Sequence, residues 1–258
     1  MSTIVVTHTA RPRHARRWLD GVVLVVVLAV LWQLLSEWLG PEVITTPWRT
    51  VHRAITIVSD ADFPESLYVT SLAFGTAFAI SAVFGVGLGL LLGARKMAGD
   101  VMEPLMMGFY SIPKVTLYPV VLLAFGLGLW AKIVFGVIHG IVPITLFTMN
   151  AVRNMPPIYT RAAHTYRLSP VEFARHVLFP ACVPEIVAGL RIGFSLTLLG
   201  TLIGEMFASQ SGIGRMLMIA MNRAETSTIM ALALMLFVFA TLVNLLFLAW
   251  QKRLTHSD

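Results

Sequence analysis

Few residues in this chain have the types and spacing that a catalytic or metal-binding site requires. The sequence contains no Ser/His/Asp arrangement and no metal-ligand spacing, and His139 stands alone. It also contains no G-x4-G-K-S/T loop, the sequence that binds nucleotide phosphates. Cys182 is the only cysteine, which excludes an internal disulfide. The sequence therefore predicts no catalytic residue, no metal site and no cofactor, and it disfavours a hydrolase.

Two charged residues, Lys114 and Glu205, lie in otherwise apolar surroundings. Lys114 stands between Pro113 and Pro119, where a broken helix frees backbone groups that can line a cavity and where an ammonium group could attract an anionic solute. Alternatively, Lys114 extends toward water or pairs with an acid such as Glu205. Glu205 could belong to a gate or could satisfy the loop that follows it. Both residues are candidates for a pathway through the protein.

Two further polar residues are better explained by packing. His139, beside Gly140, is expected to be a buried, hydrogen-bonded residue rather than a ligand. Asn244 is expected to link two helices by a hydrogen bond within an apolar environment.

The composition places all these residues in a membrane protein. Apolar residues make up 57% of the 258 residues, charged residues 12%, and the mean hydropathy is +0.80. One soluble core of this size could not bury so much apolar surface. We therefore predict an all-α, polytopic membrane protein, whose six transmembrane helices lie at about 19–39, 67–94, 104–126, 132–149, 186–207 and 228–250.

These spans divide the chain into segments. We expect a tail over 1–18, a retained first helix over 19–39, an outside loop over 40–66, a core over 67–253 and a C-terminal tail over 254–258. Pro113 and Pro119 should break the third span. Gly85, Gly89 and Gly93 recur every four residues, which favours close packing of a neighbouring helix.

The cations favour one orientation. With both termini in the cytoplasm, thirteen Lys and Arg residues lie inside and five outside, while Lys114 falls within a span. The inside set is Arg11, Arg13, Arg16, Arg17, Arg95, Lys96, Arg153, Arg161, Arg167, Arg175, Arg191, Lys252 and Arg253. The outside set is Arg49, Arg53, Lys132, Arg215 and Arg223.

A polar segment over 153–184 should then form a cytoplasmic helical hairpin. Pro156 and Pro157 can open a first helix that ends near Tyr166, leaving residues 167–168 as the turn. Ser169 to Glu172 forms a capping box with Pro170 at the first helical position. Pro180 and Pro184 should end the second helix before the next span. With small Ala162 and Ala163 beside aromatic Tyr166 and Phe173, the hairpin suits docking into a partner's groove, although an ordinary interfacial loop is the alternative.

The hairpin resembles the EAA motif, E-A-A-x3-G-x9-I-x-L-P, of permease subunits of binding-protein-dependent ABC importers. Ala162, Ala163 and Pro180 match, and Val177 and Phe179 are apolar substitutes. Arg161 replaces the usual Glu, and Arg167 replaces a Gly that would supply a positive φ, so Arg167 is strained or the turn is built differently. The resemblance implies an ATPase-coupling site comprising Arg161, Ala162, Ala163, Tyr166, Arg167, Phe173 and Pro180.

Two other segments are similar to the nitrate, sulfonate and taurine group of these importers. The first is Ile112-Pro113-Lys114 with Pro119, Phe125-Gly126-Leu127-Gly128 and Lys132-Ile133; the second is Glu205 with Ser209, Gly212 and Gly214. The resemblance implies a translocation pathway for a small anionic solute, with no catalysis of its own. A pyrimidine-type vitamin precursor is an alternative solute, and a secondary transporter is a weaker alternative because the spans hold few acids.

The same resemblance implies the partners. They are an ABC ATPase subunit, an extracytoplasmic solute-binding protein and a second permease copy. We expect a homodimer, while the departures at Arg161 and Arg167 leave a heterodimer open. No nucleic acid partner is expected, because the positive charge gathers at the ends of apolar runs.

Overall fold

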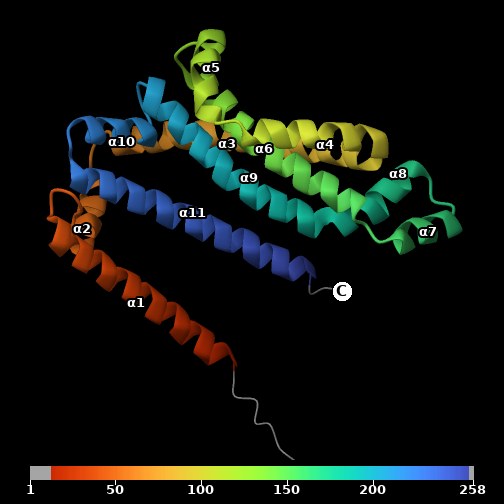
Figure 1. The fold of residues 1–258 in the computed structure, drawn as a ribbon, viewed down its shortest axis with the longest axis horizontal. Coiled ribbons are helices and arrows are strands. Elements are labelled where there is room, and N and C mark those ends of the chain that lie inside the picture. The colour runs from red at the N-terminus through yellow and green to blue at the C-terminus, as the bar shows by residue number, and fades with distance from the viewer. Residues whose placement is uncertain (1–12, 256–258) are drawn as a thin grey trace, which may run out of the picture.

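The computed structural model describes residues 13–255, and every regular element within that range is helical. Figure 1 shows long helices running side by side, with shorter helices at both ends of the bundle. The helices are α1 Arg13–Leu39, α2 Pro47–Val58, α3 Phe63–Ala94, α4 Lys96–Ser111, α5 Tyr118–Phe125, α6 Leu129–Arg153, α7 Pro157–Thr165, α8 Pro170–Phe173, α9 Phe179–Ala208, α10 Ile213–Asn222 and α11 Thr226–Thr255. Most of the two expected tails, including Arg11, lies outside the described residues.

Five segments are long and apolar enough to cross a membrane. They are Leu19–Leu39, Phe63–Ala94, Leu129–Arg153, Pro170–Phe207 and Thr226–Leu254. Two further helical segments, Lys96–Ser111 and Lys114–Phe125, meet at an angle of 88° and bring the number to six when they are counted together as one broken span. The prediction of an all-α membrane protein is confirmed, and the bend falls at Pro113 as expected. Pro119, the second expected break, stands instead in the first turn of α5. The third span begins earlier than expected, because Pro104 is accommodated inside α4.

Two parts of the sequence interpretation need correction. The segment 40–66, expected to be a loop, contains helix α2, which begins with Thr46 as its N-cap and Pro47 at the first helical position. Pro180 and Pro184 do not end a helix either. Instead, α8 continues through a π turn at Ala174–Leu178 directly into α9. Pro180 stands in the first turn of α9, and the wider turn before it lets the chain continue as one long helix.

The centre of the molecule is the packing of α3, α6 and α9. Added Cβ atoms at Gly85, Gly89 and Gly93 of α3 would lie within 2.9 Å of side chains on α6, so the expected close approach is confirmed. The Asn244 amide of α11 donates to the Ser195 hydroxyl of α9 at 3.1 Å, as expected for a link between helices.

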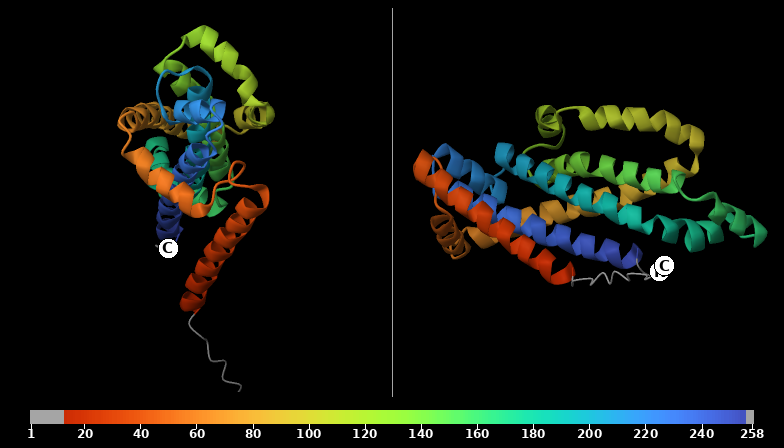
Figure 2. Two further views of the ribbon diagram at one scale, coloured as in Figure 1. Left: turned by 90° about the vertical axis from the view of Figure 1, so that its left-hand side faces the viewer. Right: turned by 60° about the horizontal axis from the view of Figure 1, so that its bottom comes forward.

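Helix α1 is attached mainly at one end. In the left view of Figure 2 it splays away from the other helices. The Trp32 indole donates to the Thr45 carbonyl at 2.9 Å, and the Ser36 hydroxyl donates to the Ile44 carbonyl at 2.7 Å. These bonds tie α1 to the turn before α2, while most of its apolar side chains remain exposed.

Candidate functional site

The polar hairpin forms a distinct projection at one end of the bundle. Helices α7 and α8 extend beyond the ends of α3 and α11 (Figure 1). The hairpin is continuous with two central helices, because only three residues separate the end of α6 at Arg153 from the start of α7, and α8 runs on into α9. The hairpin is therefore directly connected to two helices of the central packing.

The second helix of the hairpin starts at a capping box, as the sequence predicts. The Glu172 amide donates to the Ser169 hydroxyl at 3.3 Å, and the Ser169 amide donates to the Glu172 carboxylate at 2.8 Å. Pro170 occupies the first turn. These two reciprocal bonds fix where the chain turns between α7 and α8.

Arg167 lies in the left-handed region, with a φ of 52°. The Leu168 amide donates to the Ala163 carbonyl at 3.0 Å, which is the 6→1 hydrogen bond of a Schellman motif at a helix C-terminus. Glycine usually occupies the left-handed position of such an end. A side chain there costs about 1 kcal/mol. Of the two expectations for Arg167, the strained residue is the one observed.

A groove of about 260 Å³ lies between the two helices of the hairpin. Its lining residues are Thr160, Ala163, Leu168, Pro170 and Phe173. The structure thus brings together two of the predicted coupling residues, Ala163, which is 7% exposed, and Phe173. The others do not line this groove. Arg161, Ala162, Tyr166, Arg167 and Pro180 are exposed on the hairpin, and Tyr166 is 79% exposed.

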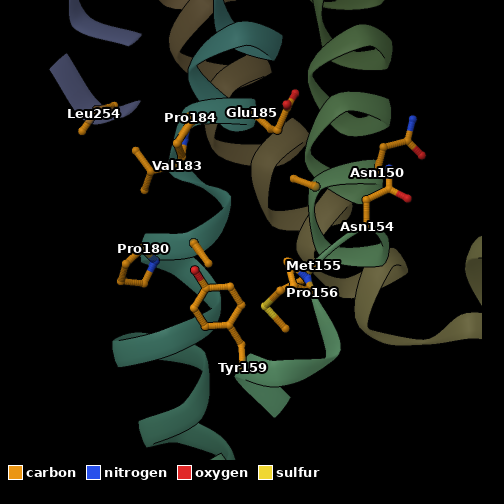
Figure 3. Close-up of a pocket in the computed structure, with 12 residues that line it drawn as sticks. Asn150, Asn154, Met155, Pro156, Tyr159, Pro180, Val183, Pro184, Glu185 and Leu254 are labelled. Atoms are coloured by element: carbon orange, nitrogen blue, oxygen red, sulfur yellow. The ribbon is translucent and has the colours of Figure 1, made fainter. Parts of the chain in front are cut away.

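A second cavity, of about 600 Å³, lies at the base of the hairpin, between the end of α6, the start of α7 and the first turns of α9 (Figure 3). Asn150 and Asn154 of the α6 end, Tyr159 of α7, and Pro180 and Glu185 of α9 line it. The sequence interpretation did not identify this space, because its lining comes from segments that are brought together only by the turn at Pro156.

Glu205 is fully buried at the other end of α9. The Thr70 hydroxyl of α3 donates to its carboxylate, with oxygen distances of 2.8 and 3.0 Å, and the Gly214 amide donates at 3.0 Å. Thr70 in turn accepts from the Ile213 amide at 2.9 Å. The carboxylate therefore joins α3, α9 and the start of α10.

The charge partner of Glu205 is Lys132, not Lys114. The Lys132 ammonium lies 3.8 Å from the Glu205 carboxylate and donates to the Ser211 carbonyl at 3.0 Å. The suggested pairing of Lys114 with Glu205 is wrong. The Lys114 ammonium donates to the Tyr110 carbonyl at 3.2 Å and lies 4.5 Å from the centre of the Tyr110 ring.

Gly212 and Gly214 allow this arrangement. Gly212 has a φ of 123°, and a Cβ there would lie 2.4 Å from the Glu205 carboxylate carbon. A Cβ at Gly214 would lie 2.7 Å from the Glu205 Cβ. The G-x-G pattern thus reflects close approach of the loop to a buried acid. Among the two roles considered for Glu205, satisfying the following loop is supported by these contacts.

His139 is a buried residue of α6. Its Nδ1 lies 2.9 Å from the Phe135 carbonyl, and its ring packs against Phe135 with ring centres 4.6 Å apart. The expectation of a buried packing residue is confirmed.

The chain is similar to known transport proteins over most of its length. Residues 85–257 match the family described as the binding-protein-dependent transport system inner membrane component. The formylaminopyrimidine transport permease protein ThiX of Halalkalibacterium halodurans is 27% identical, covering 76% of this chain and 78% of its own. The nitrate import permease protein NrtB of Synechocystis sp. is also 27% identical, covering 80% and 78%. A chain of the MetNI methionine ABC transporter, solved in inward facing conformations, shares the fold with a TM-score of 0.64 at 18% identity, covering 74% of this chain and 94% of that one.

Proposed function

The chain belongs to the family of inner membrane components of binding-protein-dependent transport systems, and we propose that it forms the pathway for a small anionic solute. It is a multi-pass membrane permease of the ABC importer type. Membership of this family implies an ATPase and a solute-binding protein as partners. The proposal concerns how this chain couples to the ATPase, how it is oriented and assembled, and what it carries.

We place ATP hydrolysis in a separate subunit that docks on the hairpin. The main support is the groove lined by Ala163 and Phe173, which lies on a capped, polar projection continuous with α6 and α9. Tyr166 and Arg161 are exposed and lie close to Ala163 in the sequence. They complete the proposed contact, together with Ala162, Arg167 and Pro180. Closure of two ATPases on nucleotide would move the hairpins, and the attached helices would alternate between outward-open and inward-open states.

The hairpin then faces the cytoplasm, as do both termini. Support comes from the excess of Lys and Arg in the segments assigned to that side, which include Arg95, Lys96 and Arg153 near the base of the hairpin. The remaining segments, including α2 and α10, face outward under this orientation.

Two permease copies complete the pathway. In the importers that this chain resembles, six spans from one chain form half of the pathway. In addition, α4 and α5 leave many apolar side chains exposed, among them Leu105, Met107, Val120 and Leu123. We propose a homodimer. A heterodimer with a subunit that retains the usual Glu and Gly of the motif is the alternative.

The solute is proposed to be an anion such as nitrate, a sulfonate or taurine. The similarity to a nitrate import permease supports this class, and Lys114 at the bend between α4 and α5 would supply positive charge. Glu205, held by Thr70, Gly214 and Lys132, would act only as a structural support beside the pathway. A formylaminopyrimidine-like precursor is the second candidate, because one relative of similar identity carries that name. Binding of each solute to the cognate binding protein distinguishes the two.

Substitution of Ala163 by glutamate tests the coupling role. A charged side chain at this position would occupy the groove, so we expect uptake per ATP hydrolysed to fall about tenfold, the effect of losing about 1.4 kcal/mol of coupling. Ile158→Glu is the matched control, because Ile158 is exposed on the same helix outside the groove. Unchanged uptake with Ala163→Glu, or equal loss in the control, would count against docking at the groove.

A further inference from the structure

A branched ion pair joins the base of the hairpin to α4. Arg153, the last residue of α6, donates from Nη1 to the Glu103 carboxylate at 2.5 Å, and its Nη2 contacts the Asp100 carboxylate. The side chain of Arg153 is 19% exposed and that of Glu103 31%, whereas that of Asp100 is 54% exposed. One guanidinium group therefore holds two points on a neighbouring helix.

The local sequence is arranged for this contact. Asp100 and Glu103 are three residues apart on α4, so both carboxylates lie on one face of the helix. The planar, forked guanidinium can bond both at once, which a lysine ammonium at the same position cannot reproduce with the same geometry. The Arg153 side chain passes beside Gly99, where an added Cβ would be in ordinary contact with the guanidinium carbon at 3.4 Å but would lie 2.7 Å from the Leu92 carbonyl oxygen.

Helix α4 has little other anchorage in the bundle. Its apolar side chains are largely exposed, with Met97 82% exposed and Val101 and Leu105 also facing outward. Gly99 is its one buried residue. Within the described range 13–255, the ion pairs of α4 are both made by Arg153.

Arg153 lies at the end of α6, next to the start of the hairpin. The Asn154 amide donates to the Asn150 carbonyl at 2.9 Å and closes the end of α6, and α7 begins at Pro157. At its other end, α4 leads through Ile112 and Pro113 to the 88° bend and to Lys114. The ion pair therefore connects the end of α6, next to the hairpin, with the first half of the bent span.

We propose that Arg153 is a positioning residue for transport, which makes α4 follow the hairpin when the ATPase moves it. The inference rests on the proposed coupling function. Without the branched ion pair, the hairpin would still dock and ATP would still be hydrolysed, but the bent span would no longer be displaced together with α6.

A distance measurement tests this without knowledge of the solute. Spin labels at Met97→Cys in α4 and Ile158→Cys in α7 are introduced into a Cys182→Ser background, since Cys182 is the only native cysteine. The complex with the copurified ATPase is measured without nucleotide and after trapping with ATP and vanadate. We expect the distance to change by less than about 2 Å with Arg153 present and by more than that in Arg153→Gln. A shift in the wild type, or no shift in Arg153→Gln, would overturn the proposal.

A set of variants separates the ion pair from a general loss of structure. Arg153→Gln, the double variant Asp100→Asn with Glu103→Gln, and the triple variant should all copurify with the ATPase. Each should lower uptake per ATP about tenfold, and the triple variant should be no worse than Arg153→Gln, because all three remove the same interaction. Arg153→Lys should give an intermediate value. Additive losses, or uptake per ATP within about twofold of the wild type in Arg153→Gln, would contradict the proposal.

Comparison of the wild type with Arg153→Gln distinguishes failure of this inference from failure of the proposed function. If the wild-type complex shows no ATP-dependent uptake of any solute its binding protein retains, the coupling function itself is wrong, and the role of Arg153 falls with it. If the wild type transports and Arg153→Gln transports equally well, only the role of Arg153 is wrong.

Discussion

Replacement of Glu205 by alanine is expected to destabilise the protein by about 4 kcal/mol. The substitution leaves the buried Gly214 amide without its acceptor, which costs about 1–3 kcal/mol. It also leaves the Lys132 ammonium buried with only the Ser211 carbonyl as a partner, and breaking a buried pair from one side costs about 3–5 kcal/mol. Water that enters the vacated space offsets part of these two costs, so the expected loss of about 4 kcal/mol lies at the lower end of their summed range.

Thermal unfolding of the detergent-solubilised protein measures this cost. A loss of about 4 kcal/mol corresponds to a fall in Tm of about 8–16 °C for a chain of this size. A second comparison isolates the ion pair. The double variant Glu205→Gln with Lys132→Met should be more stable, by about 2 kcal/mol, than the sum of the two single variants predicts, because it leaves no unpaired charge.

Either of two results would refute this reasoning. A Tm within about 2 °C of the wild type in Glu205→Ala would show that the carboxylate contributes little to the attachment of the loop at Gly212 and Gly214. Strictly additive effects of the Glu205→Gln and Lys132→Met substitutions would show that the two charges do not depend on each other.

Three other substitutions test separate parts of the account. Arg167→Gly should raise the stability by about 1 kcal/mol, because glycine adopts the positive φ without strain, and thermal unfolding would show no gain if the turn is relaxed. Gly89→Leu should cost at least about 1–3 kcal/mol, because its Cβ would meet the Thr148 Cβ at 2.5 Å, whereas Gly87→Leu, with open space around it, should be tolerated in the same unfolding assay. Lys114→Ala should reduce anion uptake in reconstituted vesicles while assembly stays intact, and normal uptake would remove Lys114 from the pathway.

The hairpin could be predicted because its signals are local. Ser169, Pro170 and Glu172 specify a helix start within four residues, and the structure contains both hydrogen bonds of that capping box. The spacing of Gly85, Gly89 and Gly93 likewise identified a packing face from one segment alone. In each case the neighbouring residues determine the backbone conformation or the helix face.

The corrections arise where the structure depends on distant or competing interactions. Glu205 is held by Thr70, 135 residues away, and by Lys132 rather than Lys114, and nothing in the local sequence identifies these partners. The sequence interpretation treated Pro180 as a stop, although a π turn before it allows the helix to continue. Helix α2 did have a local signal, Thr46 before Pro47, but the polar composition of the surrounding segment was given more weight.

The most direct test of the central claim is solute uptake by vesicles that contain this chain, its copurified ATPase and the cognate binding protein. We predict that the solute accumulates inside the vesicles against its gradient only when ATP is present on the side of the membrane that the hairpin faces. Vesicles that contain this chain alone should accumulate none. Accumulation by the chain alone without nucleotide would contradict the account, because the driving force would then reside in these helices themselves.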